Sequence, residues 1–407
     1  MSIFSRRHET GTLTLLIDIG SASVGAALVL LHQDKKPRVL FTHRSAIPFQ
    51  KSLNFERFVT GTERAIDTVA EAVIKKGLPH LSFTPYGKKR VDTIVCFFAS
   101  PWYTSQTRRI HLEKDTPFII TEETVRDIIH AEEKSFAQSR LALFTEGAGE
   151  GQIIERRIID MRLDGYSVSA PFGKRARSVH AALFLSMVPQ AIITRFTERL
   201  RRVLHVRDIG YHTFPFAAFT VLRDRFAANE DFLFLDITGE VTDVVLAKEG
   251  VLLETLSFPK GRHFVVRTLA DAFGTTEHEA LSLLAMHGTH SAETRTALKI
   301  EETLFRVQKE WLASFSDVLR KLGENVGIPH TIFYTADSDV QNLFKSFLSE
   351  EQFGQTSLTE APFRVMPLDE SFAASSLDRA DRAPTDPFLA LEGIFLQKLL
   401  CIPGKTL

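Results

Sequence analysis

The chain has 407 residues, 44% hydrophobic and 24% charged, which is enough to bury a sizeable core and suggests roughly two to three domains. Its 49 basic and 50 acidic residues nearly cancel, which argues against nucleic acid as a partner and against general attraction to an anionic bilayer. Two cysteines exclude a disulfide framework or a zinc set, and no apolar run reaches the ~20 residues needed to cross a bilayer. These features predict a protein of the reducing cytoplasm.

The N-terminal quarter predicts a lead-in followed by a β-rich domain. Residues 1–12 lack the apolar core of a secretory signal, and we interpret them as disordered. Leu13–Ile19 and Val24–Leu31 are β-type runs joined by small residues, which favours a hairpin with a tight turn. A helix is expected around Phe55–Lys76 and a buried strand at Val91–Ala99.

The rhythm changes between residues 102 and 180. A strand-like run at Thr107–Leu112 precedes a helix from about Glu122 to Ala137, whose first turn is rich in carboxylates. Two further β-type runs then flank Asp164-Gly165, a strong hairpin signal. The order strand, helix, strand, strand predicts a small module inserted between the halves of a larger domain.

The second half of the chain repeats the first hairpin. Phe232–Ile237 and Val241–Leu246 enclose a short turn about two hundred residues after the first copy, and that spacing predicts duplicated domains. Around it we expect a strand at Ala181–Val188, helices over 189–203, 268–273, 276–287 and 292–322, a strand at 331–335 and a closing helix over 388–400.

These elements predict four bodies after the lead-in. They are a first domain of residues 13–101, 181–215 and 385–400, an inserted subdomain over 102–180, a second domain over 216–348, and a partly mobile loop region over 349–384.

Both hairpin turns have the chemistry of a phosphate site. A nucleoside triphosphate held between two domains needs turns rich in Gly or Ser, whose backbone N–H groups approach its oxygens, and an Asp that holds Mg²⁺ through water. In the first hairpin Gly20 supplies the turn, Ser21 and Ser23 supply hydroxyls, and Asp18 ends the strand. One copy would indicate an ordinary hairpin, whereas two copies in matching positions favour a nucleotide cleft.

The two hairpins and the insert together resemble the FtsA and PilM family of the actin superfamily. Residues 18–24 are similar to the family's first phosphate motif, residues 236–243 to its second, and residues 258–261 to the segment that follows. The inserted module distinguishes this family from other actin relatives. The resemblance implies an α/β, actin-like (ribonuclease H-like) two-domain fold with an inserted strand-helix-strand-strand subdomain of the SHS2 type. It also implies that ATP and Mg²⁺ would be held by Asp18, Gly20, Ser21, Ser23, Asp236, Gly239, Asp243, Gly261 and Glu279, with Asp18 and Asp236 near the Mg²⁺.

Several residues differ from the family pattern at positions that should contact the nucleotide. Thr238 and Glu240 replace glycines of the second turn, and a carboxylate there would repel a triphosphate or point away from it. Residues 335–338 replace a glycine-rich adenosine motif, Ser282 replaces a lysine, and Phe214 replaces a polar residue. The departures favour weak or absent ATP hydrolysis over a working ATPase.

We therefore expect a cytoplasmic scaffold, held at the inner membrane by a short cytoplasmic peptide of a membrane partner, first of all in type IV pilus assembly. A cell-division protein that binds an FtsZ-like C-terminal tail and an active actin-superfamily ATPase are the alternatives. Residues 388–400 are interpreted as a core helix because they lack the basic face of a membrane anchor. Self-association is implied by the family alone.

Overall fold

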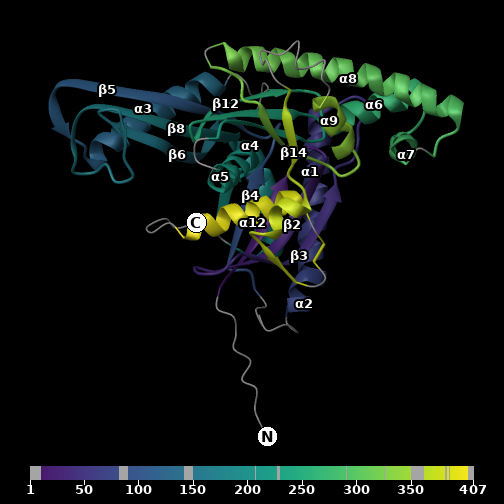
Figure 1. Ribbon diagram of the computed structural model, residues 1–407. Helices are drawn as coiled ribbons and strands as arrows, with labels where there is room; N and C mark the ends of the chain where they lie inside the picture. Colours follow the sequence, from purple (N-terminus) through teal and green to yellow (C-terminus); the bar gives the residue numbers. More distant parts are fainter. Residues whose placement is uncertain are drawn as a thin grey trace, which may run out of the picture.

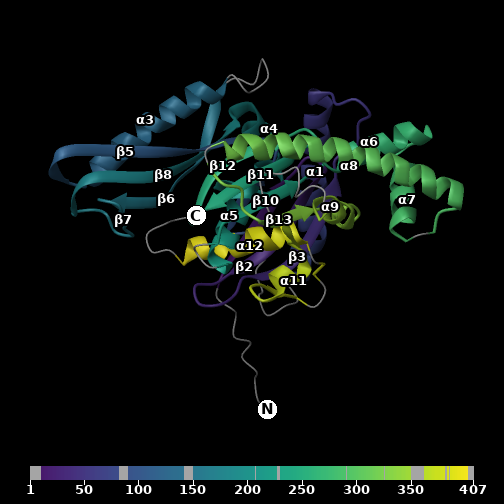
Figure 2. The same ribbon diagram turned by 45° about the horizontal axis from the view of Figure 1, so that its top comes forward.

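Three β-sheets and the helices around them make up the part of the chain that the structure describes (Figure 1). This computed structural model describes residues 11–81, 90–141, 150–206, 208–226, 230–289, 291–324, 326–349, 362–380, 383–384 and 386–401. Two sheets form the body of the molecule and the third projects to one side, as the turned view confirms (Figure 2).

The first sheet has six strands in the order β15-β3-β2-β1-β4-β9. Its strands are β1 (Thr12–Ile19), β2 (Ser23–Leu31), β3 (Arg38–Ala46), β4 (Thr93–Phe98), β9 (Ile209–Thr213) and β15 (Asp378–Arg379). Side chains alternate between its faces, so Leu15 and Ile17 of β1 pack toward one helical layer and Leu16 toward the other. The helices of the first layer are α1 (Phe55–Ala72), the π-helix η1 (Val73–Gly77), α2 (Leu78–Leu81) and α4 (Gln190–Leu204). The second layer contains α5 (Phe214–Arg225) and α12 (Pro387–Leu400).

The second sheet has five strands in the order β12-β11-β10-β13-β14. Its strands are β10 (Phe232–Ile237), β11 (Thr242–Lys248), β12 (Val251–Phe258), β13 (Thr331–Ala336) and β14 (Arg364–Pro367). The helices around it are α6 (Arg262–Phe273), α7 (Glu277–Gly288), α8 (Thr294–Gly323) and α9 (Gln341–Leu348). A short helix, α11 (Glu370–Ala374), lies between β14 and β15 in the sequence and contacts α12. On α8 the buried residues Ile300, Leu304, Val307 and Trp311 repeat every three or four positions, so one face of this 30-residue helix packs on the domain and the other faces solvent.

The third sheet is the insert, with strand order β5-β8-β6-β7. It consists of β5 (Thr104–Ile119), β6 (Gly151–Leu163), β7 (Tyr166–Ser167) and β8 (Arg175–Pro189), with α3 (Glu122–Leu141) packed on one face. Asp164 and Gly165 both have positive φ angles, 48° and 85°, which explains why this pair makes the β6–β7 turn. The predicted order of elements is therefore present in the insert.

One predicted strand lies elsewhere than expected. Residues 181–188 were assigned to the first domain, but they form the second half of β8 and pair with β5 and β6 of the insert. Their apolar side chains, Leu183, Leu185 and Met187, pack around Phe136 of α3. The run is apolar because it is the core of the insert, not because it belongs to the first sheet.

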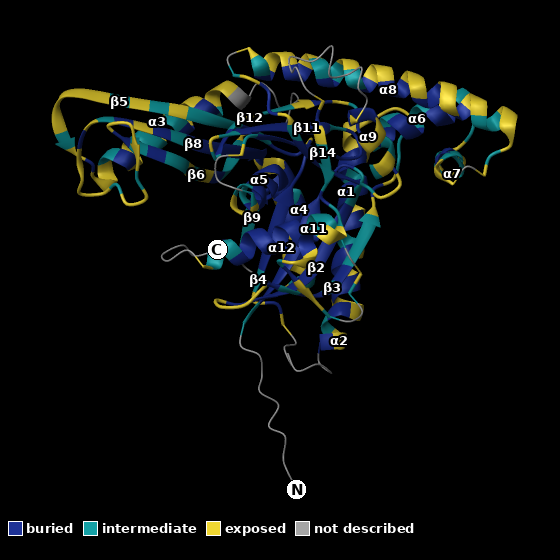
Figure 3. Cartoon of the chain, in the orientation of Figure 1, coloured by how far each residue is buried: buried dark blue, intermediate teal, exposed yellow. Residues whose placement is uncertain are grey.

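The C-terminal region contributes to both large sheets. Within the expected loop region 349–384, β14 joins the second sheet and β15 joins the first; residues 350–361, 381, 382 and 385 lie outside the described residues, as do residues 1–10 of the expected lead-in. Helix α12 is a buried element (Figure 3), begun by the Asp386 carboxylate, which accepts the Leu389 N–H at 3.1 Å. Among the described residues, no helix combines the length and apolarity that a bilayer crossing requires.

Candidate functional site

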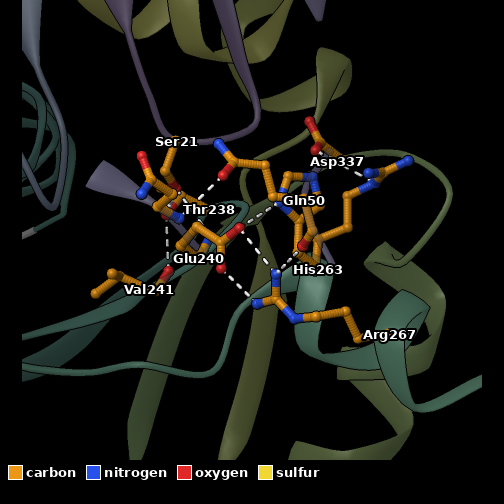
Figure 4. Close-up of polar contacts among 10 residues, drawn as sticks. Ser21, Gln50, Thr238, Glu240, Val241, His263, Arg267 and Asp337 are labelled. Carbon is orange, nitrogen blue, oxygen red and sulfur yellow. Dashed lines mark hydrogen bonds and ion pairs between the residues drawn. The ribbon is translucent and has the colours of Figure 1, made fainter. Parts of the chain in front are cut away.

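The two predicted phosphate hairpins meet at the junction of the two large domains. The Ser21 and Thr238 hydroxyl oxygens lie 2.8 Å apart, and the Glu240 N–H donates to the Ser21 oxygen at 2.9 Å (Figure 4). The Thr238 hydroxyl donates to the Val241 carbonyl at 2.8 Å, so Ser21 must be the donor to Thr238. The Ser21 hydroxyl, expected to face a phosphate, thus bonds the opposite hairpin.

Gly239 and Gly261 allow this close contact. A Cβ on Gly239 would lie 2.7 Å from the Ala22 nitrogen, and one on Gly261 would overlap the Thr238 carbonyl oxygen. Glycine is therefore required at both positions, because backbone packs against backbone there. The cavity that remains between the hairpins is about 20 Å³, which is room for roughly one water molecule.

Asp18 lies at the end of β1 as expected, but its partner is an arginine that the sequence reading missed. Asp18 Oδ2 lies 2.8 Å from Nη2 of Arg44 on β3. The same guanidinium donates to both oxygens of Asp386, at 2.7 and 3.0 Å, and to the Ser23 hydroxyl at 2.9 Å. Burial raises the pKa of Asp18 to about 6, although Arg44 acts in the opposite direction.

A glycine inside an apolar strand was the available signal for Arg44. Gly25 of β2 pairs with Arg44 of β3, and a Cβ on Gly25 would lie 2.7 Å from Arg44 Nη2. Glycine in a strand interior often marks the close approach of another group, and here that group is the guanidinium.

Asp243 and Asp236 are also engaged by protein groups. Asp243 accepts hydrogen bonds from the Ser100 hydroxyl at 2.6 Å, the Ser257 hydroxyl at 2.6 Å and the Tyr103 hydroxyl at 3.1 Å. Ser100 and Tyr103 come from the segment that follows β4, so this carboxylate joins the second domain to the first. Asp236 accepts from the Thr335 hydroxyl at 2.8 Å, while its other oxygen is buried without a hydrogen bond to any described residue. Burial raises the pKa of both aspartates.

The Glu240 carboxylate is directed toward α6 and does not line the cavity between the hairpins. Its carboxylate lies 2.9 Å from His263 Nδ1 and forms an ion pair with Arg267, both on α6. Arg267 also donates to the Gln50 carbonyl at 3.2 Å, in the first domain. Burial by itself would raise the pKa of Glu240, but the hydrogen bonds from His263 and Arg267 outweigh it and lower the pKa to about 2.

Glu279 stands apart from this cluster. It lies in the first turn of α7, where its carboxylate accepts the Thr276 N–H at 2.9 Å and the Thr276 hydroxyl at 3.0 Å. This capping box explains the residue as a helix start. Glu279 is absent from the lining of the cavity between the hairpins.

The arrangement does not fit ATP and Mg²⁺. Asp18 is bonded to a cation, Asp243 is bonded to three hydroxyls, and the space between the turns is about the size of one water. Within the described ranges, no group of three His, Cys, Asp or Glu side chains is placed to hold a metal ion. In this chain, the residues of the two hairpins make contacts between the domains.

A larger cavity, about 340 Å³, lies at the free edge of the first sheet. It is bounded by β9, α4 and the start of β6, and we call it the β9 groove. Its walls include Thr194, Arg201 and Asp208; neither charged side chain forms an ion pair with a described residue. In contrast to the cleft, this groove has polar groups left over for a ligand.

A buried carboxylate from the insert binds the end of β9, beyond the residues that line the groove. Glu155 of β6 is 2% exposed and accepts from the Thr213 N–H at 3.2 Å, the Thr213 hydroxyl at 2.7 Å and the Ser186 hydroxyl at 2.8 Å. It also lies 3.0 Å from His212 Nδ1. Because all these partners are buried, Glu155 ties the insert firmly to β9.

Two hairpins in matching positions, one on each of two stacked domains, define an actin-like fold with an inserted subdomain. No family model matches the chain, and no curated protein matches it in sequence. In structure the chain is similar to the PilM-PilN type IV pilus biogenesis complex, with a TM-score of 0.63 and 14% identity over 97% of this chain and 100% of that chain.

Two further solved structures overlay less well. The ethanolamine utilization protein EutJ from Carboxydothermus hydrogenoformans gives a TM-score of 0.41 at 10% identity, over 94% of this chain and 88% of that chain. A Bacteroides thetaiotaomicron protein with an actin-like ATPase fold gives 0.42 at 10% identity, over 96% and 98%. The predicted α/β actin-like fold is confirmed by the two matching hairpin sheets and by the likeness to the PilM-PilN structure.

Proposed function

We propose that the chain is a PilM-like adaptor of type IV pilus assembly, which binds a short cytoplasmic peptide of a membrane protein in the β9 groove. The observation that carries the proposal is an open cavity beside a free strand edge, on a chain whose nucleotide cleft is filled. The likeness to a PilM-PilN complex over 97% of this chain supports it. Such a protein would lie in the cytoplasm, at the inner membrane through its partner.

The edge of β9 has the geometry to accept an extended peptide. In a strand, the backbone groups of alternate residues point to the same side. The Thr213 N–H points outward to Glu155, so the groups of Tyr211 and Ile209 point outward too, into the β9 groove. A peptide added here as a further strand would gain main-chain hydrogen bonds, and its side chains would contact α4 and β6.

The test is the binding of a fluorescein-labelled peptide from the cytoplasmic N-terminus of the PilN-like protein of the same organism, followed by fluorescence anisotropy. Ile209→Pro removes one outward N–H from an edge strand, a position where proline is tolerated. We expect affinity to fall at least about tenfold, which corresponds to roughly 1.4 kcal/mol.

Ile209→Ala is the matched control, because it shortens the same side chain and retains the N–H. Its affinity should stay within about threefold of the wild type. Equal loss in both variants would mean that the backbone edge is not used. Selective binding of an FtsZ-tail peptide from the same organism, in place of the PilN-like peptide, would instead indicate a role in cell division.

A further inference from the structure

We propose that Arg44 is a built-in counter-ion that takes the place of a divalent cation beside Asp18 in the interdomain cleft, so that protein side chains alone satisfy the cleft. The proposal concerns the cleft and stands independently of the peptide partner.

Arg44 is held as a bound cation would be. Its guanidinium reaches Asp18 on β1, Ser23 at the start of β2 and Asp386 at the start of α12, all at 2.7 to 3.0 Å. The centre of the guanidinium also lies 5.2 Å from the centroid of the Phe388 ring. The first hairpin and the start of α12, which are distant in sequence, thus converge on one positive charge, as they would on a metal ion.

The surrounding charges require a cation at this position. Among the described residues that line the cavity, the acidic ones are Asp18, Asp236 and Asp337, and Arg44 is the one basic side chain. Glu392 of α12 is fully buried behind them, and neither of its oxygens finds a hydrogen-bond partner within the described residues. Asp337 is also paired with Arg262 at 3.6 Å. Without Arg44, however, Asp18 and Asp236 would share the small cavity without a cation of their own, which is unfavourable for their ionised forms.

A Mg²⁺ ion and Arg44 exclude each other. Both would bind Asp18, and a divalent ion at ordinary coordination distance from that carboxylate would lie within a few ångströms of the guanidinium. Since the cavity offers room for roughly one water, the arginine would have to leave before a hydrated ion entered.

On the second-domain side of the cleft, protein side chains also form the contacts that join the two domains. Arg267 joins Glu240 to the Gln50 carbonyl of the first domain, and Ser21 joins both Thr238 and Glu240. Protein groups thus occupy the positions that the phosphates of a nucleotide would take in an actin-like cleft. The closed arrangement is therefore complete without a ligand, and nucleotide would have to break it.

The first experiment uses the full-length wild type. Its melting temperature is measured with 5 mM MgCl₂, with 5 mM Mg-ATP and with neither. We expect the three values to agree within about 1 °C, because a ligand at a hundred times its Kd would raise the melting temperature by several degrees. A clear rise with Mg-ATP that Asp18→Ala abolishes would overturn the proposal.

The second experiment removes the internal cation. Arg44→Ala should melt at least about 4 °C below the wild type, and MgCl₂ should restore part of that loss because the carboxylates can then bind the ion. Arg320→Ala, which breaks an exposed pair with Asp317, is the control and should melt near the wild type without a response to MgCl₂.

Arg44→Lys separates charge from shape. It retains a cation but loses the paired contact with Asp386, so it should melt between the other two proteins and remain insensitive to MgCl₂. This variant also keeps the test decisive if Arg44→Ala does not fold. An Arg44→Ala protein that melts like the wild type, or that melts lower with no response to MgCl₂, would contradict the role of Arg44 as a substitute for the ion.

Discussion

The interdomain cleft and the β9 groove are built from the same first sheet and have opposite properties. In the cleft, the residues of the phosphate motif bond to the other domain or to Arg44, and about 20 Å³ of space remains. In the groove, about 340 Å³ lies open beside an unpaired strand edge, with Arg201 and Asp208 forming no ion pair to any described residue. The comparison teaches that a binding site is indicated by uncommitted polar groups, rather than by the presence of a motif.

The largest expected effect is a loss of stability when a contact in the cleft is removed, with no change in peptide binding at the β9 groove. Glu240→Ala leaves Arg267 and His263 without their buried carboxylate, so the free energy of unfolding should fall by about 3 kcal/mol in urea denaturation. Peptide affinity at the β9 groove should not change. Glu71→Ala, which breaks an exposed pair with Lys75, should cost less than about 0.5 kcal/mol. If both variants lose the same amount, the cleft contacts do not stabilise the closed form.

The second prediction concerns pH. The pKa of Asp18 is raised from 3.8 to about 6, first by burial, so the folded state binds a proton more tightly than the unfolded state. Its contribution to stability is therefore complete below about pH 4 and is lost as the pH rises through 6. Asp236 and Asp243, whose pKa values burial also raises, act in the same direction.

Urea denaturation from pH 4.5 to 7.5 tests this expectation. The free energy of unfolding should decrease with rising pH, by an amount on the order of 2 kcal/mol from Asp18. Asp18→Asn should flatten the curve. The carboxylate of Glu240, whose pKa is lowered from 4.5 to about 2, stays ionised in the folded protein over this range. Its contribution is lost as the pH falls from about 4.5 toward 2, so it adds only a slight opposite slope at the acid end. Stability that rises with pH would show that the cleft carboxyl groups are ionised and solvated.

The smallest expected effect is the loss of stability on removing a single hydroxyl group, one from the cleft and one from the β9 groove. Ser21→Ala removes a buried hydroxyl that accepts the Glu240 N–H and donates to Thr238, and it should cost about 1–2 kcal/mol of stability. Thr194→Ala removes an exposed hydroxyl of the β9 groove and should cost less than about 0.5 kcal/mol while weakening peptide binding. If the Ser21→Ala protein keeps wild-type stability but loses ATP binding, the cleft is a nucleotide-binding site.

Much of the fold could be predicted because its signals are local. The strands of both hairpins lie within two residues of their expected positions, and the Asp-Gly turn of the insert is where the sequence placed it. The strand at 181–188 was placed in the wrong sheet, since an apolar run indicates burial but not the element that buries it.

The candidate site was predictable only in part. Asp18, Ser21, Gly239 and Asp243 do gather at the cleft, because matching hairpins of two stacked domains face each other. Glu279 does not join them, and its position three residues after Thr276 is accounted for by the capping box.

By itself, the sequence determined the strand and helix order, the duplication of the hairpins and the replacement of the second-turn glycines by Thr238 and Glu240. Only the tertiary structure decided what these replacements do. Arg44 reaches Asp386 from 342 positions away, and Arg267 reaches Gln50 from 217 positions away. No local pattern encodes such pairs, because the charge that neutralises a buried carboxylate is chosen by proximity in space.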